Sequence, residues 1–349
     1  MKSLPVFLCV DVEPDEGTFS PDDPPPWRGF ELLWKYLGDL RPRLTEVTGE
    51  RVRYLWFLRM DPQVEMAYGS AAWAAQAYGA LFEEARERGD ALGVHPHAWR
   101  WDRPTGGWIA DHADARWVER CVADSFEAFR SHFGYPAELH RFGSRWLSDE
   151  TVDQVQRLGA RFDLTPEPGE PAVGPGDRQG ARWTGWLPDY RTVPQAPYHP
   201  SSTDFRVPSG ASDGGLWVIP LTSGRQVLRR SWHRTTASRL RHPMRTARGV
   251  MRRLRPAEVA GQSRRPGPSH RLLAMWMPWR SPQDFWASVA DRLGDIDLPY
   301  LAFAIRSDIL IRTATARTFE GIMDHLFEIP LAGRLAFTTP ADGLTRLGR

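Results

Sequence analysis

Two histidines separated by one residue, His95 and His97, are the strongest chemical signal in the sequence. They follow the apolar run Ala91-Leu-Gly-Val94, which is typical of a buried strand. Side chains alternate along an extended chain, so both imidazoles are expected on the same side, and Pro96 favours an extended backbone there. Neutral imidazole is the commonest metal-binding side chain. The pair therefore predicts half of a site for a divalent ion, with a hydrogen-bonded surface pair as the alternative.

Three carboxylates, Asp11, Glu13 and Asp15, stand at the end of the first apolar run, Pro5–Val10. They alternate along the chain, so they share one face if the backbone is extended. Carboxylates placed together repel one another unless a cation or an arginine compensates their charge. Since α/β proteins usually carry their chemistry where a buried strand ends, we predict a functional acidic site here. The alternative is an acidic loop open to water.

Further polar and aromatic side chains follow the other apolar runs. Arg59 and Asp61 come after a strand predicted at Val52–Leu58, and they either face the same pocket or form a surface ion pair. Trp99 and Trp146 come after the predicted third and fourth strands, and their flat faces suit sugar rings, with core packing as the alternative. These four residues are the predicted substrate-binding residues.

The elements that must position these residues alternate between strand and helix. Between residues 167 and 213 the chain is rich in Gly and Pro, which predicts long loops over one face, and no internal repeat is present. The order predicts a parallel sheet or barrel. Strands are predicted at Pro5–Val10, Val52–Leu58, Leu92–Val94, from Leu139, Ala160–Leu164, Gly214–Thr222, Arg271–Met277 and Tyr300–Ile305, and helices at Phe30–Leu37, Ala71–Arg88, Asp114–His132, from Ser148 to Leu158, Pro282–Leu293 and Arg317–Phe327.

Composition places the chain among folded globular proteins. Its 349 residues are 41% hydrophobic and 25% charged, and we predict one domain over residues 1–349. Only Cys9 and Cys121 occur, far apart, which favours a reducing compartment over a disulfide framework. No run reaches the ~18 apolar residues of a membrane span, and the first residues lack the long apolar core of a signal peptide. We therefore expect a cytoplasmic protein.

One sharp compositional break interrupts the chain. The segment from Arg225 to Arg271 holds fourteen arginines and one acid, Glu258, a charge of +13, so the remainder carries −11 of the formal net +2. We predict an Arg-rich insertion over about residues 225–271. Its partner is expected to be an anionic membrane surface, which would place the protein peripherally at a membrane. Nucleic acid is not expected, because no known nucleic-acid module accompanies the arginines. The alternative is a solvated insertion.

Taken in order, several short stretches resemble the polysaccharide deacetylase (NodB homology) family, carbohydrate esterase family four. The similarity covers roughly residues 5 to 310 and is that of a divergent branch. It implies a distorted (β/α) barrel of about seven parallel strands, with long loops on the C-terminal face and one divalent metal ion, usually zinc, at the strand ends. The stretches are Val10-Asp-Val-Glu13, Leu92-Gly-Val-His-Pro-His97, Arg141-Phe-Gly-Ser-Arg-Trp146, Leu158-Gly-Ala-Arg-Phe-Asp163 and Leu216-Trp-Val-Ile-Pro220.

The resemblance also implies roles for individual residues. Asp11 matches the family's general base, and Glu13 matches the metal carboxylate, although Val12 separates two acids that are usually adjacent. His95 matches the first metal histidine. The second family histidine usually lies four residues on, where this chain has Trp99, so His97 takes that role. Arg141 matches the arginine that holds the catalytic aspartate.

The last motif departs most from the family. In Ala302-Phe-Ala-Ile-Arg-Ser-Asp308, Arg306 stands where the family has a histidine general acid. Arginine cannot usefully donate a proton near neutral pH, but it could stabilise an oxyanion. The sequence leaves His140, His199 and Asp308 open as substitutes.

The predicted function is metal-dependent removal of an acyl group from the nitrogen of an amino sugar, sugar-containing metabolite or glycolipid. The predicted partner is thus an N-acylated carbohydrate or a related small molecule. The alternative is a pseudoenzyme that binds a glycan, a lipid-linked sugar or a protein without turnover.

Overall fold

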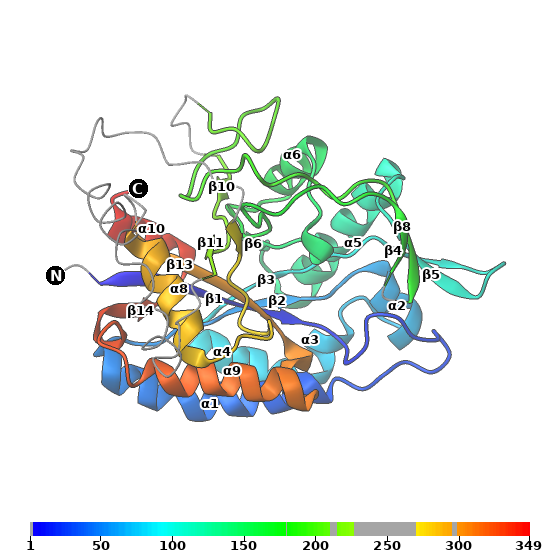
Figure 1. Cartoon of the computed structure of the whole chain (residues 1–349). Coiled ribbons are helices and arrows are strands. Elements are labelled where there is room, and N and C mark those ends of the chain that lie inside the picture. The colour runs from blue at the N-terminus through cyan, green and yellow to red at the C-terminus, as the bar shows by residue number, and fades with distance from the viewer. Residues whose placement is uncertain (1–2, 179, 210–214, 227–269, 295–298) are drawn as a thin grey trace, which may run out of the picture.

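The structure is a computed structural model that describes residues 3–178, 180–209, 215–226, 270–294 and 299–349. Its main sheet contains seven parallel strands in the order β10-β7-β6-β3-β2-β1-β13, with β14 paired beside the first residues of β1 (Figure 1). The fold class is therefore the predicted α/β distorted barrel. The strands are β1 (Leu4–Val12), β2 (Leu55–Leu58), β3 (Ala91–Val94), β6 (Leu139–His140), β7 (Phe162–Asp163), β10 (Trp217–Val218), β13 (Leu301–Arg306) and β14 (Leu335–Phe337).

Hydrogen bonds bring the two edges of this sheet toward each other. Thr222, which follows β10, donates its backbone N–H to the carbonyl of Ala302 on β13 at 2.8 Å. The N–H of Ala302 donates in return to Thr222 Oγ1 at 2.8 Å. Tyr300 adds a hydroxyl bond of 2.6 Å to the carbonyl of Pro220. The sheet is thus curled into a barrel whose edges meet beyond β10.

Helices pack around the outside of the sheet because each has one apolar face. In α1 the residues Phe30, Leu33 and Leu37 are buried on such a face, and the helix ends at Gly49, which has φ of 68°. Helices α1 and α9 lie side by side, since Tyr36 contacts Phe319 (Figure 1). The helices are α1 (Arg28–Thr48), α2 (Pro62–Tyr68), α3 (Trp73–Ala77), α4 (Gly79–Glu87), α5 (Ala115–Phe133), α6 (Asp149–Arg157), α8 (Pro282–Gly294), α9 (Thr313–Leu326) and α10 (Pro340–Leu347).

A second sheet lies beside the barrel and was not predicted. Its four strands run in the order β4-β5-β9-β8, and β4 starts two residues after His97. It joins two hairpins through the parallel pair β5·β9, so sequence-distant segments meet in it. The strands are β4 (Trp99–Asp102), β5 (Gly107–Asp111), β8 (Gly176–Arg178) and β9 (Ala181–Thr184).

Several predicted elements have different bounds. The helix predicted over Ala71–Arg88 is two helices, α3 and α4, separated by Tyr78. The strand predicted at Arg271–Met277 is shorter: β12 (His270–Leu272) pairs antiparallel with β11 (Ser223–Arg225). The two ends of the Arg-rich insertion are therefore neighbours, with Arg225 opposite His270. Its interior, residues 227–269, lies outside the described residues, and so does the membrane contact predicted for it.

In the described part of the chain, no helix is long and apolar enough to cross a membrane.

Candidate active site

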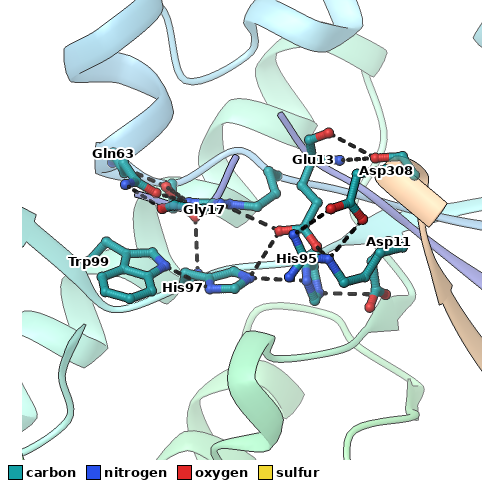
Figure 2. Close-up of polar contacts among 12 residues, drawn as sticks. Asp11, Glu13, Gly17, Gln63, His95, His97, Trp99 and Asp308 are labelled. Carbon is teal, nitrogen blue, oxygen red and sulfur yellow. Dashed lines mark hydrogen bonds and ion pairs between the residues drawn. The ribbon is translucent and has the colours of Figure 1, made fainter. Parts of the chain in front are cut away.

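The candidate site lies where the barrel interior changes from apolar to polar. Inward-facing side chains alternate along each strand, and they include Phe7 and Cys9 on β1 and Leu55 and Phe57 on β2. Steps of two residues along each chain segment, beyond these inward-facing positions, lead to the residues of the site. Strand alternation alone therefore brings them to one end of the barrel. They are Asp11, Glu13, Arg59, Asp61, His95, His97, Arg141 and Gly143, and Figure 2 shows the carboxylates of Asp11 and Glu13 beside the two imidazoles.

Asp11 is buried against Arg141, as the resemblance implies. Arg141 Nε donates to both carboxylate oxygens of Asp11, at 2.9 and 3.2 Å, and its Nη1 donates to the carbonyl of Leu164 at 2.8 Å. Burial raises the pKa of Asp11 above its ordinary value, and the charge of Arg141 partly offsets that rise. The aspartate is thus held in one orientation and is made more basic than an exposed carboxylate.

His95 has a defined tautomer. Its Nδ1–H donates to the backbone carbonyl of Arg141 at 2.7 Å, which leaves a lone pair on Nε2. Burial lowers the pKa of His95 to about 3, so the ring is neutral at physiological pH. A neutral imidazole with a lone pair on Nε2 is the form that binds a metal ion.

His97 is oriented by Trp99. The indole N–H of Trp99 donates to His97 Nδ1 at 3.0 Å, so the proton of the neutral His97 ring is on Nε2. That atom lies 3.1 Å from His95 Nε2, to which it donates. Burial places the pKa of His97 well below its ordinary value, and the charge of Arg59 lowers it further. The two histidines therefore form a hydrogen-bonded pair, but a buried one, not the surface pair considered from the sequence (Figure 2).

Glu13 is held from three sides. Its Oε1 lies 3.1 Å from Arg306 Nε, and its Oε2 lies 3.7 Å from Arg59 Nη1 and 3.8 Å from His97 Nε2. Ser307 Oγ accepts a hydrogen bond from the Glu13 N–H at 3.0 Å and donates one to the Glu13 carbonyl at 2.8 Å. Both the backbone and the carboxylate of Glu13 are thereby fixed beside the imidazoles.

Asp15 does not join the other two carboxylates. Its Oδ1 accepts the backbone N–H of Gly29 at 2.8 Å, in the first turn of α1. The prediction that three acids share one face is therefore wrong for Asp15, because β1 ends at Val12 and the chain turns beyond it. Asp15 instead satisfies an unpaired donor at a helix N-terminus.

Arg59 and Asp61 lie behind the site. Both side chains are 0% exposed, and Arg59 Nε donates to Asp61 Oδ2 at 2.8 Å. Asp61 Oδ2 also accepts the backbone N–H of His97 at 3.1 Å, and its Oδ1 accepts two backbone N–H groups at the start of α2. Because both side chains are buried, Arg59 and Asp61 are suited to hold Glu13 and His97 in place. The contacts favour this role over the substrate contact or surface ion pair expected from the sequence.

Trp99 and Trp146 are also largely buried, with 4% and 8% of their surface exposed. Trp99 lies at 14° to the His97 ring and packs on Trp183. Trp146 stacks on His112 with ring centroids 5.6 Å apart. Their faces are covered by neighbouring aromatic rings. The contacts therefore support core packing, the alternative to sugar binding that the sequence leaves open.

The histidines left open as general acids lie away from the cluster. His140 is fully buried on the outer face of β6, where Nδ1 bonds to Asp163 at 2.6 Å and the ring stacks on Phe126 of α5. His199 packs on Trp217 and bonds to the carbonyl of Leu216 at 3.0 Å.

Asp308 does lie beside the cluster, where both of its oxygens accept hydrogen bonds from Arg306, at 3.1 and 3.4 Å.

Two further residues of the site were not predicted. Glu167, in the loop after β7, places Oε1 3.9 Å from Arg141 Nη2. A Cβ at Gly143 would lie 2.0 Å from His97 Nε2, so only glycine lets that ring occupy its place. Glu167 has no recognisable signal in the sequence, whereas Gly143 lies in the stretch that carries the family resemblance.

Glu13, His95 and His97 together fit a divalent cation. One ligand atom from each residue lies within 4.8 Å of the others. The 3.1 Å between the two Nε2 atoms is close to the ~3.3 Å that two tetrahedral zinc–nitrogen bonds would give. The proton on His97 Nε2 and the ion pair of Glu13 with Arg306 would both have to be displaced.

Charge balance also supports a cation. In the described part of the chain, ion-pair contacts connect five carboxylates with three guanidinium groups at the site. The imidazoles are neutral, and the carboxylates outnumber the guanidinium groups even when Glu167 is protonated, so a divalent cation would offset the excess of negative charge.

No protein-family model matches this chain, and no curated protein matches it. Among solved structures, a protein from Parabacteroides distasonis described as a glycoside hydrolase/deacetylase has a TM-score of 0.51 and 12% identity, covering 100% of this chain and 72% of that one. A protein from Pseudomonas aeruginosa described as a polysaccharide deacetylase has a TM-score of 0.49 and 11% identity, covering 98% of this chain and 90% of that one. An allantoinase has a TM-score of 0.49 and 11% identity, covering 99% and 90%. The first of these similarities shows that the fold is shared.

Proposed function

We propose that this protein is a metal-dependent hydrolase that removes an acyl group, foremost acetyl, from the nitrogen of an amino sugar, a sugar-containing metabolite or a glycolipid. The observation that carries the proposal is the convergence of Glu13, His95 and His97 within 4.8 Å beside a buried aspartate held by arginine. The resemblance to the polysaccharide deacetylases and the shared fold support it.

Asp11 is the proposed general base. It is buried and made more basic, and Arg141 holds both of its oxygens, so it is suited to take a proton from the attacking water. The carbonyl of Arg141 also fixes the His95 ring. One arginine thereby aligns the base with the candidate metal ligands, which is the positioning that hydrolysis requires.

Glu13, His95 and His97 are the proposed ligands of one divalent ion, with zinc first among candidates because of the mixed imidazole and carboxylate donors. When bound, such an ion would polarise the acyl carbonyl and lower the pKa of a water molecule. Around it, Arg59 and Asp61 keep Glu13 and His97 in place. Arg306, with 43% of its side chain exposed, is the proposed donor to the oxyanion.

We propose a narrower role for the four residues that the sequence predicts to bind substrate, which are Arg59, Asp61, Trp99 and Trp146. Their burial supports a role in holding other groups of the site in place and not direct contact with a sugar face. Membrane attachment through residues 225–271 likewise remains a prediction.

A second candidate is binding without turnover. It is favoured by one observation: the position of the family's general-acid histidine holds Arg306, which is paired with Glu13 and Asp308. A pseudoenzyme would bind an acylated sugar or a lipid-linked glycan and release no acetate.

The test combines metal analysis with acetate release from a panel of N-acetylated sugars. We expect about one zinc per chain and measurable release from at least one sugar. His95→Ala should lose the metal, Asp11→Asn should keep the metal and lose turnover, and the exposed His132→Ala should change neither. If His95→Ala retains full metal content, the ligand assignment is wrong; metal and sugar binding without release would favour the pseudoenzyme.

A further inference from the structure

Amide hydrolysis needs a proton for the leaving nitrogen, and the source of that proton is not among the predicted residues. Arg306 stays protonated and is a poor donor. His140 is bonded to Asp163, and His199 packs on Trp217. Asp61 and Asp308 use both oxygens as acceptors of hydrogen bonds from other groups of the chain. Another carboxyl group beside Asp11 can supply this proton.

Glu167 is placed to be that acid. Its Oε1 lies 3.9 Å from Nη2 of Arg141, the same guanidinium whose Nε holds Asp11. One arginine thus separates two carboxyl groups that come from β1 and from the loop after β7. The Glu167 side chain is 13% exposed, so it is enclosed but reachable. Within the described residues, its carboxyl group accepts no hydrogen bond, which leaves it free to face a ligand.

The surroundings of Glu167 favour its protonated form. Burial raises its pKa above the ordinary value, and the negative charges of Glu170 and Asp11 act in the same direction. The charges of Arg141 and Arg145 oppose this effect without cancelling it. A carboxyl group that ionises less readily than an ordinary one is better suited to serve as a general acid.

Resting on the hydrolase function proposed above, we propose that Glu167 is the general acid that protonates the leaving nitrogen. A water oxygen bonds to the acyl carbon while Asp11 takes a proton from that water. The carbon–nitrogen bond then breaks, its electron pair stays on nitrogen, and the Glu167 O–H proton passes to that nitrogen. The products are a carboxylic acid and an amine, and the proton on Asp11 balances the one lost by Glu167.

The experiment compares substrates whose leaving groups differ in how strongly they need a proton to depart. Zinc-loaded wild type, Glu167→Gln and the control Glu46→Gln are assayed with 4-nitrophenyl acetate, phenyl acetate and N-acetylglucosamine. Glu46 is exposed on α1, on the outside of the barrel. 4-Nitrophenolate leaves without a proton, whereas an amine does not. A general acid contributes roughly 10²–10⁴-fold to the rate.

We expect Glu167→Gln to lose kcat by about 10²-fold or more on N-acetylglucosamine, less on phenyl acetate and under about threefold on 4-nitrophenyl acetate. If the wild type cleaves only the two esters, the comparison between them tests the proposal. A larger loss of kcat in Glu167→Gln on phenyl acetate than on 4-nitrophenyl acetate supports the role of Glu167. An equal loss on every substrate, or none on any, overturns the role of Glu167 while the hydrolase stands. A wild type that cleaves none of the three probes overturns both. Should Glu167→Gln fail to fold by circular dichroism, Glu167→Asp, which keeps a carboxyl group, is expected to show a smaller loss with the same dependence on the leaving group.

Discussion

Gly143→Ala tests whether the position of the His97 ring is essential to the site. The added methyl carbon would lie 2.0, 2.2 and 2.3 Å from Nε2, Cδ2 and Cε1 of His97. The backbone of Gly143 cannot easily retreat, because its N–H donates to the carbonyl of Pro96 at 2.9 Å. The substitution therefore acts on a ring atom proposed to bind metal without changing any polar group.

The size of the effect follows from that geometry. The methyl carbon is short of ordinary van der Waals contact by about 1.4 Å, so either the ring or the loop must move by roughly 1 Å. A buried overpacking of this kind costs about 1–3 kcal/mol of stability, and a misplacement of ~1 Å in a functional group can cost about 10²-fold in rate. We expect zinc affinity to fall at least tenfold and turnover to fall about 10²-fold.

The assay measures zinc affinity by competition with a chromogenic chelator, alongside thermal unfolding of the metal-free protein. Gly38→Ala is the matched control, because a Cβ at that helical position meets nothing within 4 Å. Wild-type zinc affinity in a folded Gly143→Ala protein would refute the reasoning, since His97 could not then be a ligand in its present place.

Three other perturbations have defined outcomes. Trp99→Phe removes the N–H donor to His97 Nδ1, which frees the tautomer with a lone pair on Nε2, so zinc affinity is expected to rise several-fold in the chelator assay. Arg306→Gln removes the cation paired with Glu13, so zinc affinity is expected to rise roughly tenfold while kcat falls. In the metal-free protein, His95 has a pKa of about 3, against 6.5 when unfolded, so the unfolded state binds more protons between these values. Its contribution to stability is complete above pH 6.5 and falls by about 1.4 kcal/mol per pH unit below it, as urea unfolding would measure.

Each of these three has its own control. Trp101→Phe, a change of the same size on β4, should leave zinc affinity unchanged; equal affinities in Trp99→Phe and wild type would contradict the tautomer assignment. Unchanged or weaker zinc binding in Arg306→Gln would show that the arginine does not compete for Glu13. His95→Asn should flatten the acid limb of the stability curve, and an identical limb in the variant would rule out His95 as its source.

Much of the site was predictable from local sequence because it depends on strand alternation. Glu13, His95 and Arg141 directly follow the paired ends of β1, β3 and β6, and Asp11 lies two residues before Glu13 with the same parity. Parallel strands in one sheet bring such ends together whatever the rest of the chain does. An apolar run that ends in polar residues of one parity therefore indicates both the strand and the direction of the side chain.

Other features depend on the tertiary structure, because strand alternation does not determine them. Asp15 does not share a face with Asp11, because the chain turns toward α1. The second sheet depends on pairing between β5 and β9, which lie more than seventy residues apart in the sequence. Glu167 joined the site only through its approach to Arg141. The sequence by itself determined which side chains stand at the ends of the strands, since that depends on neighbours two residues apart. Which loop residues meet them was decided by packing between distant segments, for which single positions carry no periodic signal.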